Sequence, residues 1–179
     1  MKLSFTRSML CFLVLFFALT ETGLTQSSIS GTVKDVFKSL INRDLDKLIT
    51  EINSYPTDNS LWVVGDGISN SGGNLSLHLC GSLRHFIGTI LGEDGYIRDR
   101  DFEFSGKNLT RENLVDEIGK TKISVSEALD KISEASLETS YPSQGPIPNA
   151  TSAVLLSHLY GHLNYHLGQI NYHRRLFTQ

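Results

Sequence analysis

Apolar residues recur every three to four positions in four separate segments, and this spacing is the strongest constraint on how the chain folds. It places apolar side chains on one face of an α-helix and charged residues on the other. The segment 32–52 shows the pattern most clearly, and similar stripes occur at 74–91, 110–136 and 151–177. No segment shows a convincing strand pattern. Four amphipathic helices with short-to-medium connections predict an all-α four-helix bundle.

Residues with capping preferences stand at the start of three of these segments. Thr32, with Asp35 three residues later, is a variant of the capping box. Asn74 and Thr110 are suitable N-caps for the second and third helices. Gly119 weakens the expectation of an unbroken third helix, since glycine is a poor helix former.

The connections between the predicted helices differ in composition. The connection 54–73 is rich in glycine and contains the only tryptophan, Trp62, which we expect to pack against the core. The connection 96–109 contains the alternating charges of 98–101, a pattern typical of a solvated segment. The connection 137–150 holds three of the four prolines, and it is predicted to be an extended crossover linker.

The first 26 residues predict a cleaved signal peptide rather than part of the fold. Lys2 and Arg7 precede an unbroken apolar run of 11 residues at 9–19. A membrane span takes roughly 20 residues, whereas a signal peptide needs about 7–15. We therefore expect cleavage near residue 26 and export to the periplasm or the medium, with residues 27–179 forming one domain. The alternative is an uncleaved N-terminal anchor, which would be the only contact with a membrane.

The composition of the remaining chain excludes some classes of protein. It carries 14 basic and 18 acidic residues and no basic stripe, which argues against nucleic acid as the main partner. It keeps a single cysteine, Cys80, so an intramolecular disulfide is impossible. Its stability must come from a packed core and from any bound metal.

Four of the six histidines fall in the last 22 residues. His162 and His166 are four residues apart, so they stand one above the other on the same helix face. His158 and His173 share a stripe with them and with apolar residues, so this stripe should point into the protein. Burying an imidazole without a partner is costly, and a metal ion is a partner that several imidazoles can share. The alternative is a pair of half-buried histidines bonded to backbone or side chains.

A reactive metal site usually has three protein ligands and one open position. A third ligand would have to come from a facing helix, and the segment 74–91 offers His78 and His85. Position along the helix axes alone does not decide between these two. Cys80 lies on a different face from His78 and is more typical of a small core residue than of a ligand.

The stretch HxxxHLGQI at 162–170 resembles the C-terminal motif of the DinB-like (YfiT-like) superfamily of small four-helix metalloproteins, and HLCG at 78–81 resembles its upstream motif. The resemblance covers about 32–176. It implies an up-up-down-down bundle with a three-histidine site for a divalent metal, most commonly zinc or nickel. On the matching positions, the implied ligands are His78, His162 and His166. Members of the superfamily include thiol-transferases and hydrolases.

These features predict a divalent-metal-dependent hydrolase or thiol-type transferase, in which an open coordination position is the source of reactivity. The catalytic side chains are unknown, because no HExxH motif places a general base beside the ligands. Gln169 is the neighbour best placed to support them. The alternative is a non-catalytic exported protein that binds metal or a small ligand. A homodimer through an exposed helix face is compatible with either function.

Overall fold

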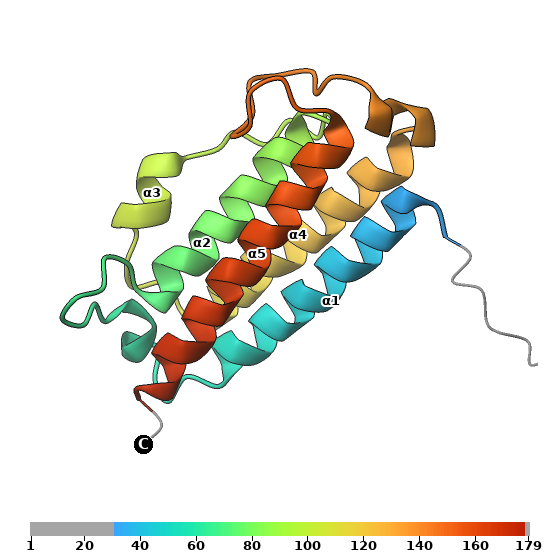
Figure 1. The fold of residues 1–179 in the computed structure, drawn as a ribbon. Coiled ribbons are helices and arrows are strands. Elements are labelled where there is room, and N and C mark those ends of the chain that lie inside the picture. Colours follow the sequence, from blue (N-terminus) through green and yellow to red (C-terminus); the bar gives the residue numbers. More distant parts are fainter. Residues whose placement is uncertain (1–30, 178–179) are drawn as a thin grey trace, which may run out of the picture. The chain divides into compact units, whose positions relative to one another are not determined.

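The computed structural model describes residues 31–177, which form a bundle of four long helices with a short fifth helix beside it (Figure 1). The prediction of a signal segment at 1–26 lies outside the described residues. A single isolated β-bridge, Ser140 with Thr151, interrupts an otherwise helical pattern. The α-helices are α1 (Val33–Asn53), α2 (Gly72–Leu83), α3 (Arg100–Ser105), α4 (Arg111–Lys131) and α5 (Ser152–Arg175). The all-α bundle predicted from the periodicity is therefore confirmed.

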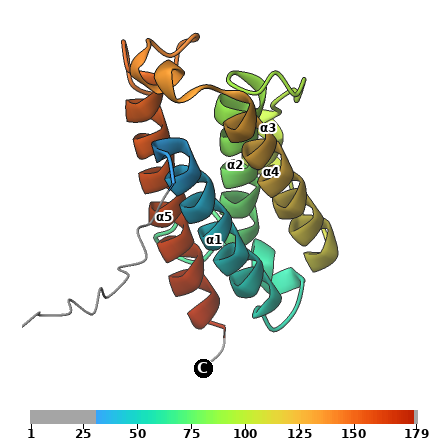
Figure 2. The same cartoon turned by 90° about the vertical axis from the view of Figure 1, so that its right-hand side faces the viewer.

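Contacts between helix ends define the direction of each helix in the bundle. Lys34, at the start of α1, donates to the backbone of Asp130 at the end of α4, so these two helices are antiparallel. Arg174, at the end of α5, binds Glu51 near the end of α1, so α1 and α5 are parallel. Figures 1 and 2 show α2 running beside α5 in the opposite direction.

The order of helix directions along the chain is up, down, down, up, which corrects the up-up-down-down order that we predicted. Only the connection from α2 to α4 runs back along the bundle, and α3 packs against α2 on the way. The linker 137–150 crosses the end of the bundle instead of running along its length (Figure 1). An up-up-down-down order needs two long crossovers, and this chain has one.

The predicted helix starts agree closely with the structure, with one informative exception. Thr32 and Asp35 form the expected hydrogen bonds at the start of α1, and Thr110 caps α4. The N-cap of α2 is Ser71 and not Asn74, which lies one turn inside the helix. The side chain of Asn74 instead donates to the carbonyls of Glu103 and Gly106. Asn74 therefore fastens α3 to α2.

The predicted apolar stripes form the core between the helices. Trp62 packs into this core, as expected, and its indole N–H donates to the carbonyl of Leu109. At Arg84 the regular α2 gives way to a π-helical segment, Arg84–Thr89, and α4 ends at Lys131 instead of continuing to 136. In the part of the chain that the structure describes, no helix is both long and apolar enough to cross a membrane.

Candidate metal centre

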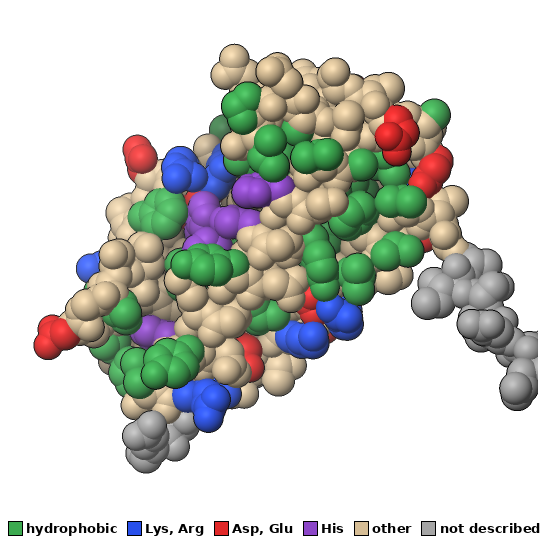
Figure 3. All heavy atoms as spheres, in the orientation of Figure 1, with side chains coloured by type: hydrophobic (Ala, Val, Ile, Leu, Met, Phe, Trp, Pro, Cys, Tyr) green, Lys and Arg blue, Asp and Glu red, His purple; other side chains and the backbone are tan. Residues whose placement is uncertain are grey.

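Three histidines from two helices come together on the face where α2 and α5 meet. His78 comes from α2, and His162 and His166 come from successive turns of α5. One ring nitrogen of each lies within 4.8 Å of those of the other two. The Nε2 atoms of His78 and His162 are 3.1 Å apart. Figure 3 shows histidine side chains gathered at the surface beside a group of Lys or Arg side chains.

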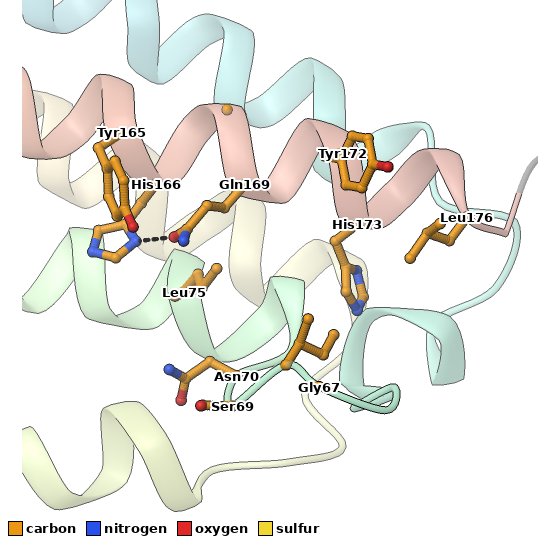
Figure 4. Close-up of a pocket in the computed structure, with 12 residues that line it drawn as sticks. Gly67, Ser69, Asn70, Leu75, Tyr165, His166, Gln169, Tyr172, His173 and Leu176 are labelled. Atoms are coloured by element: carbon orange, nitrogen blue, oxygen red, sulfur yellow. Dashed lines mark hydrogen bonds between the residues drawn. The ribbon is translucent and has the colours of Figure 1, made fainter.

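Hydrogen bonds to the other ring nitrogens define the tautomers of two of these histidines. His78 Nδ1 is 2.9 Å from a carboxylate oxygen of Glu103, which only accepts, so Nδ1 carries the proton. His166 Nδ1 likewise donates to Oε1 of Gln169 at 2.6 Å (Figure 4). In the neutral form of each ring, Nε2 then keeps its lone pair. An outer hydrogen bond of this kind is how metal-binding histidines are normally oriented.

A buried ion pair holds His78 in place. Glu103 on α3 is 3% exposed, and Arg98 binds it with two parallel hydrogen bonds of 2.6 and 2.8 Å. Burial alone would raise the pKa of the Glu103 carboxyl, but hydrogen bonds from Arg98 and His78 outweigh it and hold the pKa below its usual value. Glu103 is thus a carboxylate whose two oxygens are both occupied.

Sequence reasoning missed Arg98 and Glu103, because alternating charges are typical of a solvated segment. Half of that expectation is wrong, since Arg98 turns inward while Asp99 and Arg100 remain exposed. The signal that could have revealed the pair is their spacing, with Arg98 just before a short helix and Glu103 one turn inside it. A carboxylate such as Glu103 often accepts a hydrogen bond from the second ring nitrogen of a metal-binding histidine.

The imidazoles of α5 are held in the neutral form that binds metals. Burial, together with the neighbouring histidines and Arg98, lowers the pKa of His162 to about 4. Burial also lowers the pKa of His166, although the hydrogen bond to Gln169 partly opposes this. At neutral pH both rings are uncharged, and no proton must leave before a cation binds.

The cluster fits a divalent metal by its chemistry. Three imidazoles suit zinc and nickel, the two metals that the resemblance to the DinB-like superfamily implies. His162 Nδ1 is buried and has no hydrogen-bond partner. An imidazole with an unpartnered buried nitrogen costs free energy, which a metal bond at Nε2 would offset.

The remaining histidines lie outside this cluster. His85 packs against the ring of Phe86, and His158 is exposed with its ring stacked near that of His162. His173 is buried at the end of α5, where it binds Tyr55 and the backbone of Val63. Among the described residues, His78, His162 and His166 are the one group that could hold a metal.

Two hollows flank the three histidines. We call the first, of about 700 Å³, the cleft; it lies beside His166 and is lined by residues that include Asn70, Leu75, Tyr165, Gln169 and Tyr172 (Figure 4). We call the second, of about 220 Å³, the recess; its lining includes His78, Phe86, Arg98, Arg100, His158 and His162. The cluster is therefore accessible from both sides.

A helical bundle with a histidine triad between two of its helices is the arrangement that the resemblance to the DinB-like superfamily implies. The chain belongs to the family described as "Protein of unknown function (DUF1572)", whose sequence profile matches residues 31–179. The superfamily membership implied by the HxxxHLGQI motif is thereby confirmed.

Two solved structures share the fold. A conserved protein from Enterococcus faecalis has a TM-score of 0.67 and 16% identity, over 83% of this chain and 99% of that one. A DinB-like protein from Bacillus cereus has a TM-score of 0.64 and 17% identity, over 81% of this chain and 92% of that one. At these identities the likeness shows the fold alone. No curated protein matches the chain.

Proposed function

We propose that this protein is a divalent-metal-dependent enzyme, a hydrolase or a thiol-type transferase, with zinc or nickel held by His78, His162 and His166. The observation that carries the proposal is the convergence of three imidazoles, two of which bond an outer acceptor through Nδ1. Structural histidines have no need of this arrangement, because their nitrogens bond directly to protein groups.

Residues around the triad hold its histidine rings in position. Glu103 and Arg98 hold the ring of His78, and Gln169 holds that of His166. When bound, a divalent metal supplies Lewis-acid chemistry and lowers the pKa of a water or thiol at its open position. The cleft and the recess admit a small molecule to the histidines from either side.

One observation favours the alternative, a non-catalytic metal or small-ligand binder. No Asp or Glu lines the cleft or the recess. Glu103, the carboxylate in contact with the triad, has both oxygens bonded to Arg98 and His78 and is not free to accept a proton. An enzyme on this scaffold would have to rely on the metal and the substrate for its proton transfers.

Metal content is the first test. Wild-type protein, purified without a polyhistidine tag, should contain close to one equivalent of zinc or nickel by elemental analysis. The double variant His162→Ala/His166→Ala should contain none, and His158→Ala, on the same helix, should match the wild type. Equal metal in the double variant and the wild type would refute the metal centre.

Turnover separates the enzyme from the binder. Metal-loaded wild type should hydrolyse or transfer groups from at least one member of a panel of esters, amides and thiol acceptors, and the double variant should not. A protein that binds metal stoichiometrically but turns over none of the panel is the non-catalytic binder.

We also propose that the chain is exported through the segment 1–26. Expression in a bacterial host and N-terminal sequencing of the exported protein should give a start near residue 27. A start at Met1 in the membrane fraction would support the anchored alternative. The predicted homodimer is tested by the mass of the purified protein in light scattering.

A further inference from the structure

The two hollows beside the triad differ in charge. The cleft is lined by uncharged side chains, several of them aromatic or apolar, with no Lys, Arg, Asp or Glu among its lining residues. The recess, by contrast, is lined by two arginines and no acid.

One of the two arginines is available to a ligand. Arg98 is neutralised by Glu103 through two hydrogen bonds. Arg100 is exposed and forms no salt bridge with any described residue. A free guanidinium in a hollow is suited to bind the paired oxygens of a carboxylate, sulfonate or phosphate.

Stacking holds Arg100 next to the triad. Its guanidinium lies 5.3 Å from the ring centre of Phe104, and that ring lies 5.0 Å from the ring of His78. Phe104 therefore stands between the arginine and a triad histidine. An anionic group on Arg100 would lie in the same recess as His78 and His162.

We propose that the ligand of this protein is an organic anion whose acidic group binds Arg100 in the recess and whose uncharged, largely apolar body lies in the cleft against Tyr165 and Tyr172. The triad lies between the two hollows, so the bond or atom next to the acidic group is the one presented to it. This inference rests on the proposed function for the role of the metal, but the charge preference belongs to the chain itself.

The test uses a matched pair of probes, phenylbutanesulfonate and its uncharged N,N-dimethylsulfonamide, titrated calorimetrically into metal-free and zinc-loaded protein. Sulfonate is a weak metal ligand, so a preference for it reports on Arg100. Wild type should bind the sulfonate about five- to tenfold more tightly, in both metal states. Arg100→Gln should abolish this preference, whereas Lys107→Gln, which removes an exposed cation outside the recess, should keep it.

A second pair of variants tests the cleft. Tyr172→Ala should weaken both probes by about five- to tenfold, whereas Phe102→Ala, an exposed aromatic outside both hollows, should leave them unchanged. Equal affinity of wild type for the two probes, equal losses in Arg100→Gln and Lys107→Gln, or unchanged binding in Tyr172→Ala would each overturn the inference. Zinc content is measured on the same samples, so a failure of the metal site appears as missing zinc and not as a missing charge preference.

Discussion

Helix α5 carries two histidine sites that differ in how their nitrogens are bonded. At the end of the helix, His173 Nδ1 is 2.8 Å from the hydroxyl of Tyr55, and Nε2 is 3.0 Å from the carbonyl of Val63. Both of its nitrogens are satisfied by protein groups. About three turns earlier, His162 has one buried nitrogen without a partner and another that faces His78.

The difference separates a structural histidine from a candidate ligand better than burial does. His173 is the more buried of the two, yet its hydrogen bonds leave no lone pair free. Nε2 connects α5 to Val63, which follows the short 3-10 helix Asn59–Trp62, and Nδ1 connects it to Tyr55. His162, by contrast, bonds only another triad histidine through Nε2 and leaves Nδ1 without a partner, so a cation shared by the three rings would replace that single contact.

The largest expected effect is that of metal on the triad. Zinc at a thousandfold excess over its dissociation constant should raise the free energy of unfolding by about 4 kcal/mol, because only the folded chain holds the three imidazoles together. The variant His78→Ala/His162→Ala/His166→Ala should show no such gain in thermal unfolding scans. A gain of the same size in this variant would mean that zinc binds elsewhere.

Removing the structural histidine should give the opposite result. His173→Ala leaves the buried Tyr55 hydroxyl with only its long bond to the carbonyl of Ile170 and opens a cavity, at a cost of about 2–3 kcal/mol. Chemical denaturation of the metal-free protein measures this loss. The variant should still bind one equivalent of metal, and His158→Ala, which is exposed, should leave both quantities unchanged. Loss of metal in His173→Ala would end the distinction between the two sites.

Removing a residue that orients a triad histidine should weaken metal binding less than removing one of the three ligands. Glu103→Gln removes the charge that orients His78 and pairs with Arg98, so metal affinity should fall about 10- to 100-fold. Competition with a chelator of known affinity measures the change. Asp101→Asn, on the exposed side of the same short helix, is the control and should keep wild-type affinity. Identical metal affinities in the two variants would show that Glu103 does not support the metal site.

The four helices could be predicted from the sequence because the apolar spacing that indicates a helix is contained within each segment. The predicted starts at Thr32, Thr110 and 151 agree with the N-caps of α1, α4 and α5. The order of helix directions could not be predicted in this way. It depends on which connection runs along the bundle, and no local pattern in 91–110 encodes that route.

The site was only partly predictable for a related reason. His78 and His85 are seven residues apart and share one face of a regular helix, so periodicity does not separate them. The structure separates them by register, because α2 and α5 are antiparallel and Gly72 lies beside His173. This register brings His78, about two turns before His85, level with His162 and His166.

A smaller change in stability should follow when a triad histidine is replaced by an apolar side chain. His162→Leu removes the unpartnered nitrogen and keeps the volume, and it loses only the contact with Nε2 of His78, so the metal-free protein should gain at most about 1 kcal/mol of stability while losing its metal. His166→Leu also breaks the bond to Gln169 and should gain less. Denaturant titration of both variants without metal measures this. A metal-free His162→Leu less stable than wild type would show that the ring is structurally satisfied after all.

The smallest effect is the pH dependence of His173 in metal-free protein. Burial lowers its pKa in the folded state, against the hydrogen bond to the Val63 carbonyl, whereas the unfolded chain keeps a value of about 6.5. The unfolded chain therefore binds more protons, and the contribution of His173 is lost as the pH falls below about 6.5. The stability gap between wild type and His173→Gln should then narrow from pH 7 to pH 5. His162 and His166 titrate equally in both proteins, so they cancel from the difference in stability. A difference that stays constant or grows would show that the folded protein holds His173 protonated.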